Sequence, residues 1–234
     1  MVLVGLVALG TFAAFRTSDP RLEGRPTRDW VRDLSSGDPK VQRAAQEVFR
    51  RHRDVAGDEL AHMVRPGWTG VIRRLRVLQP GAWLPSRWVS WVRERVLRRE
   101  LDQIQAVRMC RALGSNSDAV GLSLERALAD ARPFARSEAA RTLGSLGWRP
   151  ERALPKLAGL LSDPEVGVRS GAAQGMALYG AAAAPWRDRL VALTNDAQPG
   201  VAFSCRLALA ALDTPDRVIR TTNEFGEIQL RLDR

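Results

Sequence analysis

The sequence predicts an all-α fold in which helical hairpins stack into a solenoid. Three aspartates, Asp130, Asp163 and Asp196, recur 33 residues apart. Six residues before each aspartate is a leucine, and nine residues after it is a small residue; these are Leu124, Leu157 and Leu190, and Ala139, Ala172 and Cys205. A fixed period of about 20 to 50 residues is typical of repeat arrays, in which each unit buries its apolar face only against its neighbours.

The composition is that of a folded protein with an unusual charge balance. The 234 residues are 45% hydrophobic and 26% charged, which is ordinary for a globular chain, but the net charge is +10 and the pI is about 11.2. Such a charge raises nucleic acid, anionic lipid and acidic protein as partners. Lys40 and Lys156 are the only lysines among 36 basic residues, an arginine bias that a GC-rich genome also produces without any ligand.

Residues 1–16 are expected to be a hydrophobic anchor or signal segment, followed by a linker over 17–27. The uncharged run over 2–15 is shorter than the ~20 residues of an upright transmembrane helix, and it lacks the polar face of a solenoid helix. Without an A-x-A cleavage site, an uncleaved anchor is favoured over a cleaved signal. Arginines follow the run and none precedes it, which by the positive-inside rule keeps the body in the cytoplasm, unless the true start lies upstream.

The solenoid is expected over residues 28–213, as about six hairpins. Asp38 and Pro39 predict the start of a helix that buries Val41, Ala45, Val48 and Phe49. In the C-terminal half, SLERALAD, ALPKLAGLLSD and WRDRLVALTND are expected to be first helices of hairpins, and the segments after them second helices that the repeated aspartates cap. Gly147 and Gly180 are predicted helix C-caps.

The repeated segments resemble the HEAT-repeat family, whose second helix begins Asp-Pro-x-Val-Arg and continues with paired alanines. The match is best over 163–180, through Asp163, Val168 and Arg169, whereas the last unit has Ala202 in place of the arginine. The resemblance implies a right-handed α-α superhelix that acts as a non-catalytic scaffold for protein interactions. It also implies two alternative roles for Arg136 and Arg169: a surface for a partner on the concave face, or braces that bond a junction aspartate.

The N-terminal segment is similar to bacterial membrane-tethered or exported HEAT-repeat proteins, in which a leader precedes a helix with the pattern Gly-x5-Trp. Gly24 and Trp30 occupy those positions. This resemblance implies a solenoid outside the cytoplasm, in the periplasm, and we rank it slightly above the argument from flanking charge.

The histidines and cysteines indicate no catalytic or metal site. His52 and His62 are ten residues apart, with a turn expected around Gly57, so they do not share a helix face as metal ligands would. Cys110 and Cys205 lack CxxC spacing and are expected to be buried. Because common nucleophile, phosphate-loop and zinc motifs are also absent, we expect no enzyme and no cofactor.

Residues 55–115 are expected to hold two degenerate repeats, and their most unusual feature is a cluster of tryptophans and arginines. Trp88 and Trp91 stand beside Arg93 and Arg95. Such a cluster suits stacking on nucleic acid, as in HEAT-like DNA glycosylases, or contact with anionic lipid or protein. Helical spacing of Trp88 with the apolar residues after it favours burial in a repeat. A protein partner, with the membrane contacted through the N-terminal segment, is therefore preferred, and a basic nucleic-acid-binding solenoid is the alternative.

Residues 214–234 are expected to form a C-terminal tail or a cap over the last repeat. The segment EFGEIQLRLDR alternates apolar and polar residues, which is typical of extended chain.

Overall fold

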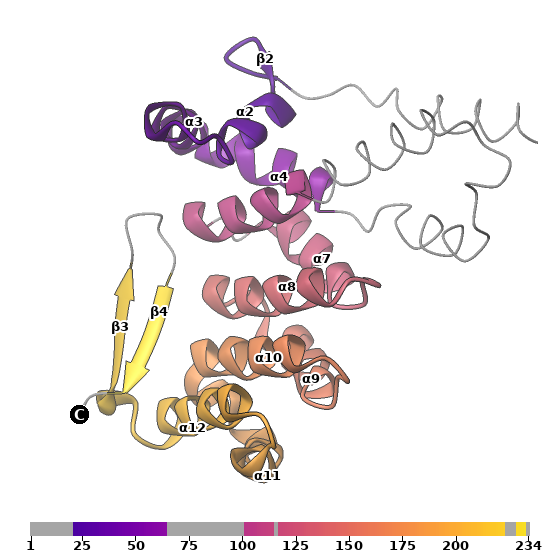
Figure 1. The fold of residues 1–234 in the computed structure, drawn as a ribbon, viewed down its shortest axis with the longest axis vertical. Helices are drawn as coiled ribbons and strands as arrows, with labels where there is room; N and C mark the ends of the chain where they lie inside the picture. The colour runs from indigo at the N-terminus through magenta and orange to yellow at the C-terminus, as the bar shows by residue number, and fades with distance from the viewer. Residues whose placement is uncertain (1–20, 65–100, 115–116, 223–227, 233–234) are drawn as a thin grey trace, which may run out of the picture.

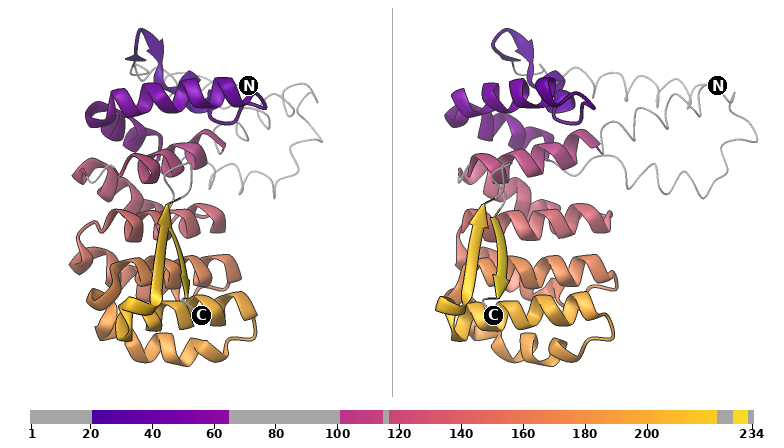
Figure 2. Two further views of the ribbon diagram at one scale, coloured as in Figure 1. Left: turned by 90° about the vertical axis from the view of Figure 1, so that its left-hand side faces the viewer. Right: turned by 60° about the vertical axis from the view of Figure 1, so that its left-hand side comes forward.

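The computed structural model describes residues 21–64, 101–114, 117–222 and 228–232. Their helices stack in two layers along the longest axis of the molecule (Figures 1 and 2). The first helices of the hairpins are α2 (Thr27–Asp33), α4 (Arg53–Met63), α7 (Asp118–Ala127), α9 (Pro150–Leu160) and α11 (Arg187–Ala192). The second helices are α3 (Pro39–Arg51), helix 101–113, α8 (Pro133–Leu146), α10 (Val166–Tyr179) and α12 (Pro199–Asp213). The predicted helical solenoid is confirmed.

The residues that define the 33-residue period form the core. Leu124, Leu157 and Leu190 on the first helices are fully buried, and Ala139, Ala172 and Cys205 on the second helices are as well. Because the small residues carry little side-chain volume, the backbones of the second helices approach closely. One apolar core therefore runs continuously from hairpin to hairpin.

The second helices begin with two kinds of cap. Asp38 is the N-cap of α3 and accepts a hydrogen bond from the Lys40 amide at 2.8 Å, as predicted. The repeated aspartates were predicted to cap the second helices, but they lie two residues before the N-cap: α10 begins at Val166 and its N-cap is Glu165. Asp163 accepts from the Glu165 amide at 3.0 Å, so it fixes the turn that enters the helix rather than the first helical turn itself.

Glycines end two second helices as predicted. Gly147 follows α8 with φ 61° and Gly180 follows α10 with φ 57°, a region that residues with a Cβ rarely adopt. Gly180 also begins the 3₁₀ helix η2 (Gly180–Trp186), and the short η3 (Leu193–Asn195) and η4 (Pro215–Arg217) flank α12.

The described part of residues 55–115 makes one hairpin. Helix α4 packs directly against α7, and Gln103 Nε2 donates to the Val64 carbonyl at 2.8 Å, so helix 101–113 lies beside the end of α4. Gly57 is buried within α4, and the predicted turn between His52 and His62 is wrong. The predicted second repeat of this region falls on residues 65–100, outside the described residues.

Two antiparallel β-hairpins correct the expectation that the fold is entirely α-helical. Strands β3 (Val218–Thr222) and β4 (Ile228–Leu232) pair with Arg220 opposite Leu230, and they stand beside the second helices, packed on α12 (Figures 1 and 2). The alternation of apolar and polar residues predicted extended chain where β4 lies, but its partner strand β3 was not predicted. Arg220 Nη2 donates to the Leu178 carbonyl at 3.0 Å, which ties this hairpin to the end of α10.

The N-terminal hairpin explains the Gly-x5-Trp pattern. Strands β1 (Arg21–Leu22) and β2 (Arg25–Pro26) are joined by a turn in which Gly24 has φ 76°. Trp30 Nε1 donates to the Leu22 carbonyl at 3.0 Å, and the Arg25 guanidinium lies 4.5 Å from the Trp30 ring centroid. The glycine permits the turn and the tryptophan fastens it to α2.

The apolar run over 2–15, predicted as an N-terminal hydrophobic helix, lies outside the described residues. Among the residues that the structure does describe, no helix combines the length and hydrophobicity needed to cross a membrane.

Candidate functional site: the face of the second helices

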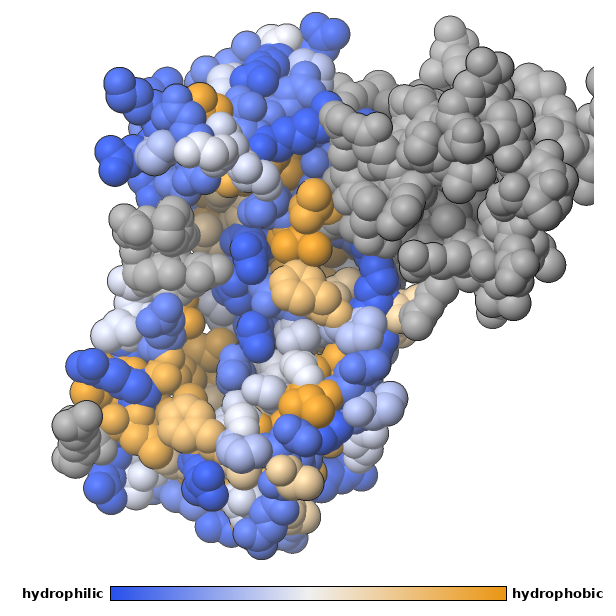
Figure 3. All heavy atoms as spheres, viewed as in Figure 1, coloured by the Kyte–Doolittle hydropathy of each residue, from blue (hydrophilic) through white to orange (hydrophobic). Residues whose placement is uncertain are grey.

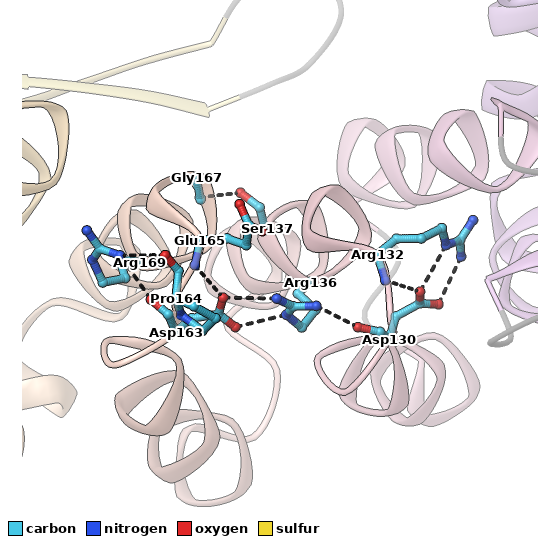
Figure 4. A network of polar contacts seen from close by, with 9 residues as sticks. All are labelled: Asp130, Arg132, Arg136, Ser137, Asp163, Pro164, Glu165, Gly167 and Arg169. Atoms are coloured by element: carbon cyan, nitrogen blue, oxygen red, sulfur yellow. Dashed lines mark hydrogen bonds and ion pairs between the residues drawn. The ribbon is translucent and has the colours of Figure 1, made fainter. Parts of the chain in front are cut away.

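Arg136 joins two neighbouring repeats. Its Nε and Nη2 donate to the two carboxylate oxygens of Asp163, both at 2.9 Å, and its Nη1 donates to the Asp130 carbonyl at 2.9 Å (Figure 4). Such a planar, bidentate contact fixes orientation as well as distance. The side chain thus holds the start of its own helix α8 and the start of α10 in a fixed relation.

Arg169 repeats the arrangement one unit later. Its Nε and Nη2 donate to the carboxylate of Asp196 at 3.0 and 3.2 Å, and its Nη1 donates to the Asp163 carbonyl at 3.0 Å. Of the two roles predicted for Arg136 and Arg169, the structure shows the bracing contacts. Their use by a partner stays a prediction, and the internal acceptors compete with it.

These contacts keep the aspartates ionised. Burial opposes ionisation of Asp163, but hydrogen bonds from Arg136 and the Glu165 amide outweigh it and lower the pKa of the carboxyl. Hydrogen bonds from Arg169 and from the Gln198 amide likewise lower the pKa of Asp196. The junctions are therefore ion pairs at neutral pH.

The junction before Asp130 uses a different arginine. Thirty-three residues before Arg136 stands Gln103, which lacks a charge to offer. Arg132 takes over: its Nε and Nη2 donate to Asp130 at 2.9 Å each, and its Nη2 also donates to Gln103 Oε1. Against the cost of burial, this contact lowers the pKa of Asp130. Asp130 thus keeps the position of the repeated aspartate, but the arginine that bonds its carboxylate comes from position 132 rather than from position 103.

Comparison with known proteins agrees with this geometry. Residues 94–177 match the family model of HEAT repeats. These residues of the chain therefore carry HEAT repeats. No curated protein matches the sequence. Among solved structures it is similar to the crystal structure of an engineered protein from the Northeast Structural Genomics Consortium, with 18% identity and a TM-score of 0.41, over 79% of this chain and 78% of that chain.

The solenoid has a close backbone contact between α8 and α10. A Cβ added at Gly175 would lie 2.5 Å from the Ala140 carbonyl oxygen, and one added at Gly171 would collide with Ser137. Only a hydrogen atom fits at either position. Ser137 Oγ donates to the Gly167 carbonyl at 2.8 Å, so even the hydroxyl at this contact is satisfied internally.

A charged cluster joins helix 101–113 to α8 instead. Glu138 is buried, and its carboxylate accepts hydrogen bonds from Arg111 Nη2 at 3.2 Å and Arg141 Nη1 at 3.0 Å. Arg108 Nε lies 3.9 Å from the same carboxylate. This cluster was not predicted from the sequence, although one signal was present: Arg108 and Arg141 are themselves 33 residues apart.

Both cysteines are buried, and the two histidines lie at opposite ends of α4. Burial raises the pKa of the Cys110 thiol to about 12 and that of Cys205 to about 11, which keeps both thiols protonated. His52 Nε2 lies 3.2 Å from Glu23 Oε1, far from His62 at the other end of α4. Within residues 21–64, 101–114, 117–222 and 228–232, no group of three or more His, Cys, Asp or Glu side chains could hold a metal ion.

Four predicted surface residues, Trp88, Trp91, Arg93 and Arg95, lie outside the described residues. In the described chain, several arginines on the side of the first helices are paired: Arg149 with Asp118 at 2.6 Å and Arg152 with Glu125 at 2.8 Å. Within the described residues, paired arginines therefore lie on both sides of the solenoid.

Proposed function

We propose that this HEAT solenoid is a non-catalytic scaffold that binds another protein on the face formed by helix 101–113, α8, α10 and α12. The observation that carries the proposal is the exposure of Leu101 and Phe134, two large apolar side chains on neighbouring second helices. Exposed apolar groups of this size beside charged ones are typical of protein interaction surfaces.

The distribution of arginines favours a protein over nucleic acid as the partner. A groove that follows a nucleic-acid backbone needs several unpaired cations in a row. In the described chain Arg136, Arg169, Arg149 and Arg152 each have a carboxylate partner. Arginine richness then reflects internal bracing and overall composition more than a continuous binding track.

Site-specific photo-crosslinking tests the proposal. A photoreactive residue is placed at Gln174 on α10 and, as the matched control, at Glu151 on α9, which is exposed on the other layer. In cells of the source organism, we expect a discrete protein adduct at Gln174 and a much weaker one at Glu151. Equal crosslinking at both positions, or an adduct only at Glu151, would contradict binding on the face of the second helices.

The apolar run over 2–15 is proposed as a tether that holds the solenoid at a membrane, with the repeats in the periplasm. Fractionation combined with protease treatment of intact and opened cells tests this, using a C-terminal tag. We expect the tag to be found in the membrane fraction. We also expect protease to digest the tag once the outer envelope is opened. A tag in the soluble fraction contradicts tethering, and a tag that stays protected contradicts the periplasmic placement.

A further inference from the structure

The 33-residue period places equivalent side chains in rows along the second helices. One row holds Leu101 and Phe134, followed by Gly167 on α10. A second row, seven residues later on each helix, holds Arg108 and Arg141. Because residues i and i+7 share a helix face about 10 Å apart, each helix presents an apolar group and a guanidinium on one side.

All four side chains are solvent-accessible. Leu101 is 56% and Phe134 46% exposed, and the side chains of Arg108 and Arg141 are 46% and 32% exposed. Neighbouring packed helices lie about 8–10 Å apart, so the four groups mark the corners of a patch that matches the width of one peptide segment. We call these four residues the mixed patch.

Glu138 holds the arginines of the mixed patch in place. Its buried carboxylate lies between Arg108 and Arg141 and is also bonded by Arg111, whose side chain is only 10% exposed. At the surface, the one carboxylate of Glu138 thus faces the two exposed guanidinium groups of Arg108 and Arg141, so positive charge exceeds negative charge within the mixed patch. Arginines positioned in advance lose less freedom when they bind a further anionic group.

The C-terminal β-hairpin runs along the second helices from α12 toward the level of α8 (Figures 1 and 2). Strands β3 and β4 pack on α12, and Arg220 binds the end of α10 through the Leu178 carbonyl. In the space-filling view, apolar surface gathers at the hairpin end, and hydrophilic residues alternate with apolar ones over the helix stack (Figure 3). At the position of Arg108 and Arg141, α12 carries Leu207, which is buried. The side chains of the two rows are therefore accessible on helix 101–113 and α8, whereas the equivalent residue on α12 is buried.

We infer that the mixed patch binds an acidic segment of a partner protein, whose carboxylates pair with Arg108 and Arg141 and whose apolar side chains contact Leu101 and Phe134. The inference rests on the proposed scaffold function and adds the chemistry of the partner. Charge complementarity favours an acidic ligand, because Glu138 already shows how a carboxylate fits between these guanidinium groups. A nucleic acid would find two accessible cations here and a buried carboxylate beneath them.

Fluorescence anisotropy with the full chain tests this at about 150 mM salt, where the Debye length is about 8 Å and distant charges are screened. The probe is a labelled peptide of alternating glutamate and leucine. The comparison probes are the same peptide with glutamine for glutamate and a single-stranded oligonucleotide of equal charge. We expect the acidic peptide to bind with Kd below about 100 µM, and the glutamine peptide and the oligonucleotide to bind at least about tenfold more weakly.

Matched variants locate the site. The double variant R108Q/R141Q should weaken peptide binding at least about tenfold, whereas R149Q/R152Q, which removes the same charge from the side of the first helices, should change it less than about twofold. Phe134→Ser leaves the charge intact and should weaken binding about threefold or more. A thermal melt of each variant separates loss of binding from loss of folding.

Several results would overturn the inference. These are no binding of the acidic peptide, equal binding of the glutamine peptide, equal losses in the two double variants, or tighter binding of the oligonucleotide. None of them bears on the crosslink at Gln174. A crosslinked partner without acidic-peptide binding would leave the scaffold function standing and remove only the assigned chemistry.

Discussion

The junction between α8 and α10 and the junction between helix 101–113 and α8 bring equivalent helices together by different means. At the first, glycines allow backbone contact, and Gly175 leaves no space for a Cβ beside Ala140. At the second, the buried carboxylate of Glu138 is surrounded by arginines. Close backbone contact leaves no space for a ligand, while the second junction keeps the guanidinium groups of Arg108 and Arg141 accessible at the surface. One repeat architecture therefore joins neighbouring helices either by close packing or by a buried charged group.

The largest expected effect is loss of the core beneath the rigid junction. Leu157→Ala deletes a fully buried side chain that faces Gly175, and we expect it to lower the free energy of unfolding by about 2–5 kcal/mol. Urea denaturation monitored by circular dichroism measures it. Val191→Ala, at an exposed position of α11, is the control and should cost under about 0.5 kcal/mol. Similar costs for the two variants would show that the register of the repeats is misassigned.

Two glycine substitutions sharpen the comparison. Gly175→Ala should destabilise the fold by about 1–3 kcal/mol, because the added methyl meets backbone atoms of α8 that cannot retreat. Gly159→Ala, in α9 with open space around it, should stabilise by about 0.5–1 kcal/mol through helix propensity. The same denaturation experiment compares them, and a stabilising Gly175→Ala would contradict the close contact between α8 and α10.

The two junctions should respond alike to acid through different arginines. The pKa of Asp163 is lowered in the fold by Arg136, and that of Asp130 by Arg132, despite burial. A lowered folded pKa gives stability that is fully present above the unfolded value of about 3.9 and is lost as pH falls through the folded pKa. Unfolding free energies measured from pH 7 down to about pH 2 should fall at the acid end.

Arginine variants separate the two contributions. Arg136→Gln should reduce the part of the pH dependence of the unfolding free energy that comes from Asp163. Arg132→Gln should reduce the part that comes from Asp130. Each variant should lower the unfolding free energy less at low pH than at pH 7. Acid curves that stay parallel to the wild type in both variants would mean that these ion pairs do not set the response.

The 33-residue period was sufficient to predict the buried leucines, the small residues at the helix contacts and the positive φ of Gly147 and Gly180, because each follows from local spacing and steric need. The bracing of Asp130 by Arg132, at the junction where Gln103 stands in the position equivalent to Arg136, was not predictable, since it depends on which side chain reaches Asp130 in three dimensions. Strand β3 was also missed, because its five residues carry too little alternation to identify a partner strand.

The mixed patch was only partly visible in the sequence. Arg108 and Arg141 share the period, but burial of Glu138 between them depends on how closely helix 101–113 approaches α8. Sequence reasoning instead gave weight to Arg136 and Arg169, because the family pattern singles them out. The family pattern marks residues that hold repeats together, whereas the recognition that we propose depends on Arg108 and Arg141, which that pattern does not include.

A double-mutant cycle on Arg136 and Asp163 tests the stacked register most directly. Asp163→Asn keeps an oxygen for the Glu165 amide, and Arg136→Met keeps the aliphatic stem, so the cycle isolates the ion pair that joins α8 to the start of α10. We predict a coupling energy of about 1–3 kcal/mol at pH 7, and none between Arg136 and the exposed Asp188. A coupling for Arg136 and Asp163 within about 0.3 kcal/mol of zero would contradict the stacked arrangement on which the proposed binding face depends.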